Sequence, residues 1–180
     1  MPVIGVSRKQ EIFEEIIYTI GSLRTRLHSL MVSLQAQPIV PGHIKDRIKN
    51  ADDILLIISD VCLVAGKEWG EVKKMARIVP FGQEKIFSAI RKLEKDEDKI
   101  IKLVKELSAV VYSDRRTHDF LKTNHYDIYA DLKRFMFSCI KAMAELISEE
   151  RELEIQIEGL EKEFEYNAEA TIAKYFPHIK

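Results

Sequence analysis

The chain is poor in the residues that form turns, with seven glycines and five prolines among 180 residues. Collagen-like and turn-rich all-β architectures need more of both, so this composition excludes them. Two cysteines are too few for a disulfide scaffold. Valine, isoleucine and threonine nowhere alternate with polar residues for long enough to predict a strand.

Long apolar runs are also missing. The longest covers residues 54–65, is interrupted by Ser59 and Asp60, and is well short of the ~20 residues of a membrane span. The first nine residues lack the apolar core of a signal peptide. We therefore expect no membrane span and a cytoplasmic protein in which Cys62 and Cys139 are buried, reduced thiols.

The chain has almost no excess of charge of either sign, since its formal net charge is −1. This balance gives no general attraction to nucleic acid or anionic membranes. The chain has 23 isoleucines but only five glutamines, and its charged residues are largely lysine and glutamate. That bias is typical of thermophile proteins.

What the chain does have is apolar residues at helical spacing. Residues 7–36 repeat them with gaps of three and four, which predicts a helix that buries one narrow stripe. Two prolines and a glycine at 38–42 end this helix. The stripe consists of Phe13, Ile16, Ile20, Leu23, Leu27, Leu30 and Leu34.

The same periodicity predicts four further helices, at about 43–65, 67–79, 83–112 and 124–176. Gly66 and Gly70 indicate the break between the second and third. The helix over 43–65 is apolar on most of its circumference from residue 54 on, so we expect it to be the most buried.

These helices predict one all-α domain over 1–180, an antiparallel bundle of four to five helices with a long C-terminal helix. At ~1.5 Å per residue the last helix would be on the order of 75 Å long, against ~45 Å for the first. It would then project beyond the bundle unless it breaks, with Gly159 the expected place.

The uneven charge along the chain predicts either solvated helix faces or self-association of the projecting part. Residues 145–165 carry nine acids against two bases, whereas residues 85–105 carry seven bases against four acids. The acidic helix of one copy could pack along the basic helix of another, burying an apolar stripe that soluble proteins usually cover. The expected oligomer interface is Leu153, Ile157, Leu160 and Phe164.

A dense polar cluster at 113–119 is the best candidate for chemistry. If the third long helix continued past Val111, Asp114, His118 and His125 would share one face and could hold a metal ion or form an acid–base pair. Arg115 and Arg116 are the alternative, as an anion-binding pair. The third interpretation is an ordinary polar corner between helices, because Ser113 and Asn124 both resemble helix caps.

Two patterns of acidic residues have no assigned function. Asp46, Asp53 and Asp60 recur every seven residues opposite the apolar stripe, which predicts a solvent-facing line or a site for a cation or basic partner. Glu97 occupies the stripe position between Leu93 and Ile100. Either the helix bends there, or that position lies beyond the packed region.

We therefore expect a non-enzymatic interaction or scaffold protein that forms a homo-oligomer through its C-terminal helix. One alternative is a small helical enzyme or metal-binding protein that uses the corner at Asp114, His118 and His125. The other is nucleic-acid or anion binding through the lysines of residues 85–105 with Arg115 and Arg116. Two observations argue against nucleic-acid binding: the net charge is low, and no aromatic residues lie between the basic residues. The sequence names no cofactor.

Overall fold

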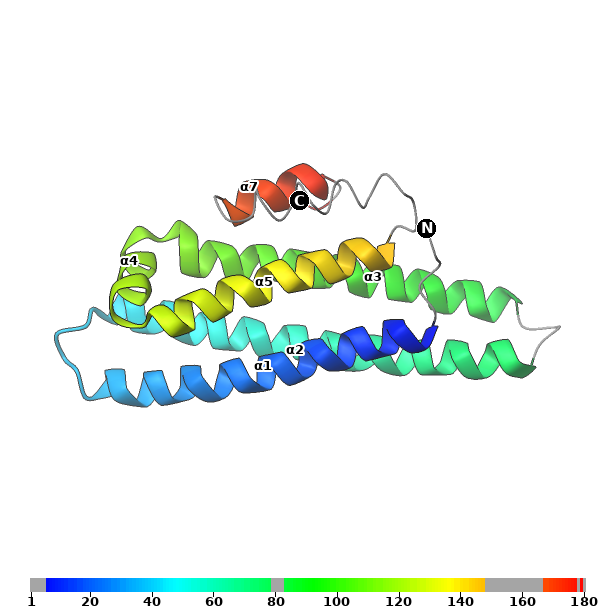
Figure 1. The fold of residues 1–180 in the computed structure, drawn as a ribbon, viewed down its shortest axis with the longest axis horizontal. Coiled ribbons are helices and arrows are strands. Elements are labelled where there is room, and N and C mark those ends of the chain that lie inside the picture. The colour runs from blue at the N-terminus through cyan, green and yellow to red at the C-terminus, as the bar shows by residue number, and fades with distance from the viewer. Residues whose placement is uncertain (1–5, 79–82, 148–166, 178, 180) are drawn as a thin grey trace.

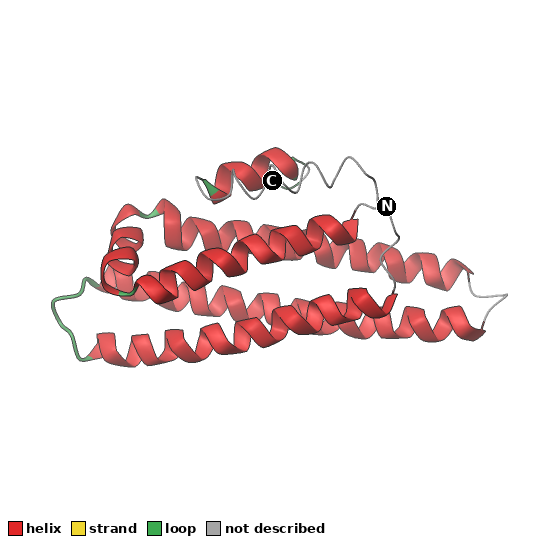
Figure 2. Ribbon diagram, in the orientation of Figure 1, coloured by secondary structure: helices red, strands yellow, loops and turns green. Residues whose placement is uncertain are grey.

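The computed structural model describes residues 6–78, 83–147, 167–177 and 179. Over these ranges the chain forms helices and connecting loops without a strand, as Figure 2 shows, and the predicted all-α class is confirmed. None of the described helices is both long and apolar enough to cross a bilayer. The helices are α1 (Val6–Gln35), α2 (Gly42–Ile78), α3 (Gln83–Ser108), the π-helical segment η1 (Ala109–Ser113), α4 (Arg115–Asn124), α5 (Tyr126–Ile147) and α7 (Ala168–Tyr175).

Four long helices lie side by side in two layers, α1 with α2 and α3 with α5 (Figure 1). Successive long helices run in opposite directions (Figure 1). The short helix α4 lies at one end, where η1 leads into α5, and α7 lies over α3. This order leaves the outer faces of α1 and α2 on the side of the molecule opposite α7.

The core forms where the apolar stripes of the four long helices meet. All seven stripe residues of α1, from Phe13 to Leu34, are buried, as predicted. Leu55 and Ile58 of α2, Val104 and Leu107 of α3, and Leu132, Met136 and Cys139 of α5 have no exposed side-chain surface left. Burial of these stripes is the main stabilising term of the fold.

The predicted break at Gly66 is wrong. A single helix, α2, replaces the helices expected at 43–65 and 67–79 and runs through both Gly66 and Gly70. Its apolar stripe continues past the glycines, because Trp69 and Val72 are buried at 4% exposure. Gly66 lies against α1, where an added Cβ would come 3.8 Å from Cβ of Phe13. Packing of the continued stripe outweighs the modest helix penalty of glycine.

The prediction that the second helix is the most buried is also wrong. One face of α2 packs in the core, but Leu56, Ile57, Leu63 and Val64 on the opposite face are 40–51% exposed. Apolar residues around the circumference of α2 therefore do not mean that the whole circumference is buried.

The segment after α3 differs from the prediction too. The helices expected at 83–112 and 124–176 leave residues 113–123 outside any helix, but most of them form α4, which Asp114 begins by accepting a hydrogen bond from the Thr117 amide. Asn124 is the last residue of α4 rather than the first of α5.

A continuous helix over 124–176 is wrong as well. Helix α5 is described to Ile147, and residues 148–166 lie outside the described ranges. Asn167 has extended backbone, with φ −155° and ψ 99°, and caps a separate helix, α7. Ile172, Phe176 and Ile179 of this C-terminal segment are buried, and Ser113 donates a 2.8 Å hydrogen bond to Glu169. The chain's end therefore packs on the bundle instead of projecting from it.

Candidate functional site

The outer face of α2 carries two pairs of exposed aliphatic residues, which together we call the apolar strip. It consists of Leu56, Ile57, Leu63 and Val64, exposed by 40%, 43%, 50% and 51%. The spacing of seven within each pair, Leu56 with Leu63 and Ile57 with Val64, keeps all four on two adjacent turns of one face. Exposed apolar residues clustered on one helix face mark a contact site more often than scattered single residues do.

Between the two pairs runs a line of charged residues, which we call the charged ridge. It consists of Asp46, Asp53, Asp60, Lys67 and Lys74, all exposed and seven residues apart. The predicted solvent-facing line of Asp46, Asp53 and Asp60 is therefore confirmed. The ridge is acidic in the first half of α2 and basic in the second. Its one described ion pair is weak and exposed, between Lys74 Nζ and Glu71 Oε1 at 3.4 Å.

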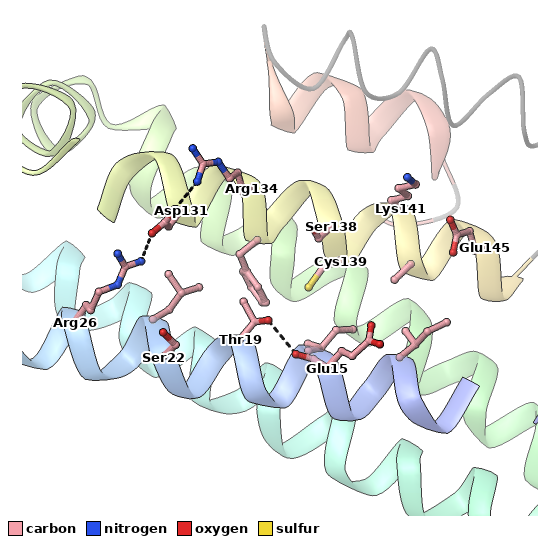
Figure 3. Close-up of a pocket in the computed structure, with 15 residues that line it drawn as sticks. Glu15, Thr19, Ser22, Arg26, Asp131, Arg134, Ser138, Cys139, Lys141 and Glu145 are labelled. Atoms are coloured by element: carbon pink, nitrogen blue, oxygen red, sulfur yellow. Dashed lines mark hydrogen bonds and ion pairs between the residues drawn. The ribbon is translucent and has the colours of Figure 1, made fainter. Parts of the chain in front are cut away.

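A second candidate is the groove between α1 and α5, with a volume of about 560 Å³ (Figure 3). Asp131 lies at one end and accepts hydrogen bonds from Arg26 of α1 and, at 3.0 Å, from Arg134 of its own helix. Arg26 Nε is buried without a hydrogen-bond partner. Acids and bases both line the groove, so its polar groups favour no ligand of one charge.

The floor of this groove carries no reactive group. Cys139 points into it, as Figure 3 shows, but the side chain has no exposed surface. Burial raises the pKa of the Cys139 thiol well above 9, and burial likewise raises the pKa of Cys62 to about 12. Both cysteines are therefore buried thiols, as expected, and a thiol in such surroundings is a poor nucleophile.

The polar corner disperses the predicted metal ligands. Asp114 caps α4 through Thr117 and also lies 3.0 Å from His43 Nε2 and 3.6 Å from Arg47 Nε. Hydrogen bonds from Thr117 and then His43 lower the pKa of Asp114, so its carboxylate stays ionised. The expected contact between Asp114 and the His118 ring is replaced by these partners.

The two histidines of the corner face elsewhere. His118 places Nε2 at 3.1 Å from the Tyr129 hydroxyl and Nδ1 at 3.1 Å from Asp119. His125 ends α4 by donating its backbone N–H to Leu121, and burial lowers the pKa of its ring. Within the described ranges no three His, Cys, Asp or Glu side chains are arranged to hold a metal ion. The structure therefore does not bring Asp114, His118 and His125 together as one site.

The other predicted sites gain no ligand-binding geometry here. Arg115 is 94% exposed and lies 3.8 Å from Asp119, and Arg116 is exposed on the same first turn of α4. Anion binding by this pair stays a prediction. The expected oligomer interface at Leu153, Ile157, Leu160 and Phe164 lies outside the described residues.

One buried and two half-buried acidic groups on α2 and α3 were not expected from the sequence. Glu97 is 2% exposed, and burial raises its pKa to about 7. The carboxyl groups of Glu68 and Asp96 hydrogen-bond each other between α2 and α3. Glu68 Oε2 and Asp96 Oδ2 are buried oxygens without a hydrogen-bond partner. Burial is the largest cause that raises the pKa of both groups.

No family model matches the chain, and comparison with curated proteins and with solved structures finds no significant similarity.

Proposed function

We propose that this protein is a helical interaction module that binds another protein chain through the outer face of α2. The observation that supports this best is the apolar strip. Four aliphatic side chains, each about half exposed, lie together on two turns of one long helix. Covering each would contribute on the order of 1 kcal/mol, before the cost of association.

Within the described ranges, the other large apolar residues that are exposed do not form a comparable surface. Tyr18 and Val32 are both on α1 but fourteen residues apart, Ile39 is in the loop that follows, and Tyr126 begins α5. Single exposed residues of this kind are normal on a soluble surface. The strip differs because its two pairs recur after seven residues on one helix face, and apolar anchors that recur with the helical period are how helices dock on partner helices or grooves.

The rigid backbone of α2 also favours the apolar strip as a binding surface. The strip lies mid-way along a helix of 37 residues whose opposite face packs on α1 and α3, so it is held in place before any partner arrives. A preformed surface loses little conformational entropy on binding. Self-association through the C-terminal residues Leu153, Ile157, Leu160 and Phe164 stays a separate prediction.

Site-specific photo-crosslinking in the cells that produce the protein tests the proposal. A photo-reactive residue at Leu63 should yield a covalent adduct with a protein chain, and adding Leu56→Glu should abolish that adduct. The matched control places the same photo-reactive residue at Lys102, which is exposed on α3. An adduct that is equally strong at Lys102, or that survives Leu56→Glu in a folded protein, would contradict the proposal.

A further inference from the structure

We infer that the partner of this surface is a second copy of the same chain, with the two α2 helices antiparallel about a two-fold axis at Asp60. This inference rests on the proposed function of α2 as a protein-binding face. It goes further by naming the partner, the orientation and the register.

The charged ridge is the observation that favours an antiparallel orientation of the two α2 helices. Acidic Asp46, Asp53 and Asp60 precede basic Lys67 and Lys74, and all five are exposed on one face. In an antiparallel pair turned about Asp60, residues at equal distances on either side of it meet. Asp53 then faces Lys67 of the partner subunit, and Asp46 faces Lys74 of the partner subunit. A parallel pair in register would instead place every charge opposite its own kind.

The apolar strip is the observation that favours this register of the two helices. Residues on the two flanks of the ridge meet with an offset of one residue, because only neighbours on the same flank can touch. The same two-fold axis therefore brings Leu56 beside Leu63 of the partner subunit on one flank and Ile57 beside Val64 of the partner subunit on the other. Both apolar pairs are formed twice, on the two sides of the ridge, so all eight side chains are covered by apolar partners. This self-complementarity is what a two-fold interface requires, because the same patch must fit itself.

A competing register differs from this one by one heptad. That shift turns the pair about a point between Leu63 and Val64, so that Asp60 meets Lys67 and Asp53 meets Lys74, whereas Asp46 faces position 81, outside the described residues. However, Ile57 then lies against Glu71 of the partner subunit. Exposed ion pairs contribute little to affinity, whereas apolar burial is the main favourable term. The register about Asp60 is therefore favoured, although its axis brings two Asp60 carboxylates together.

A charge exchange distinguishes these arrangements, with mass measured by sedimentation equilibrium from micromolar to millimolar concentration. The wild-type chain should reach twice its 20.9 kDa. Lys67→Asp creates two like-charged pairs with Asp53 and should weaken the dimer at least ~3-fold. Adding Asp53→Lys restores opposite charges and should return the dissociation constant to the wild-type value.

The matched control is the same exchange on α3, Lys102→Asp with Glu106→Lys, which should leave the dissociation constant unchanged. A wild-type chain that stays monomeric overturns the inference, while a photo-adduct at Leu63 with a different protein would leave the proposed function standing. In the shifted register Lys67 faces Asp60 and Asp53 faces Lys74, so the double exchange would fail to restore binding. That result overturns the register.

Discussion

Arg24 of α1 and Asp52 of α2 form a hydrogen bond of 2.9 Å between Nε and Oδ1, on a carboxylate that keeps only 7% of its surface exposed. His28 Nε2 lies 2.9 Å from the other oxygen of the same carboxylate. The contact joins the middle of the first two helices, beside the stripe that both bury.

Asp52→Ala should lower the free energy of unfolding by about 2 kcal/mol, because it leaves the partly buried Arg24 guanidinium without its acceptor. Urea unfolding measures the change. Glu106→Ala, at an exposed position of α3, should change stability by less than ~0.5 kcal/mol. An equal loss in both variants would show that the contact between Arg24 and Asp52 is not specifically stabilising.

Glu97→Gln should remove a pH dependence of stability. Burial raises the pKa of Glu97 from 4.5 to about 7, a shift that Lys9 opposes and that Glu94, Asp98 and Asp96 increase. Between these pH values the folded protein holds a proton that the unfolded chain releases. The group's stabilising contribution is therefore full below pH 4.5 and lost as the pH rises to about 7.

The amide that replaces the carboxyl group in Glu97→Gln cannot ionise, so the variant should exceed the wild type in stability above pH 7 by up to about 3 kcal/mol. Urea unfolding on both sides of this window measures the difference. Glu94→Gln, at an exposed neighbouring position, should follow the wild-type profile. A parallel loss of stability with pH in Glu97→Gln and the wild type would refute this role of Glu97.

Gly66→Ala should raise the free energy of unfolding by ~0.5–1 kcal/mol, because alanine favours a helix interior. The new Cβ would meet Cβ of Phe13 at 3.8 Å, which is ordinary contact. Gly21→Ala should give a similar gain, since nothing lies within 4 Å of its added Cβ. Thermal unfolding compares the two. Destabilisation at Gly66 alone would mean that α1 and α2 pack too closely there for a methyl group.

Asp60→Asn should strengthen the dimer several-fold, because it removes the repulsion between two carboxylates at the two-fold axis while keeping a side chain of the same size. Sedimentation equilibrium measures the dissociation constant. Asp119→Asn on α4 changes the net charge equally and should leave it unaltered. If both variants strengthen association alike, the effect reflects net charge and not the axis.

The sequence predicted the helix class and the buried face of α1 because a stripe with gaps of three and four residues has one physical explanation, burial against other helices. It failed at Gly66 because local propensity was weighed without the packing of Trp69 and Val72 beyond it. It failed at Asn167 because a capping residue within an apolar periodic pattern looks like part of the helix.

The surface of α2 shows a different limit. Its apolar residues at 56, 57, 63 and 64 are visible in the sequence, but periodicity alone does not say which faces of a mostly apolar helix other helices cover. The pattern of Asp46, Asp53 and Asp60 predicts an acidic line that ends at Asp60, because the predicted break at Gly66 separates it from Lys67 and Lys74. Likewise, nothing local distinguishes buried Asp52 from exposed Asp53 until Arg24 is placed opposite.

Disulfide formation by Asp60→Cys tests the antiparallel self-pairing of α2 most directly. The native Cys62 and Cys139 are fully buried, so they should not compete under mild oxidation. A two-fold axis at residue 60 places the two new thiols side by side, whereas Asp53→Cys would separate its pair by about 21 Å along the helices. The account predicts a covalent dimer for Asp60→Cys and none for Asp53→Cys. A monomeric Asp60→Cys protein, or equal dimer from both variants, would contradict it.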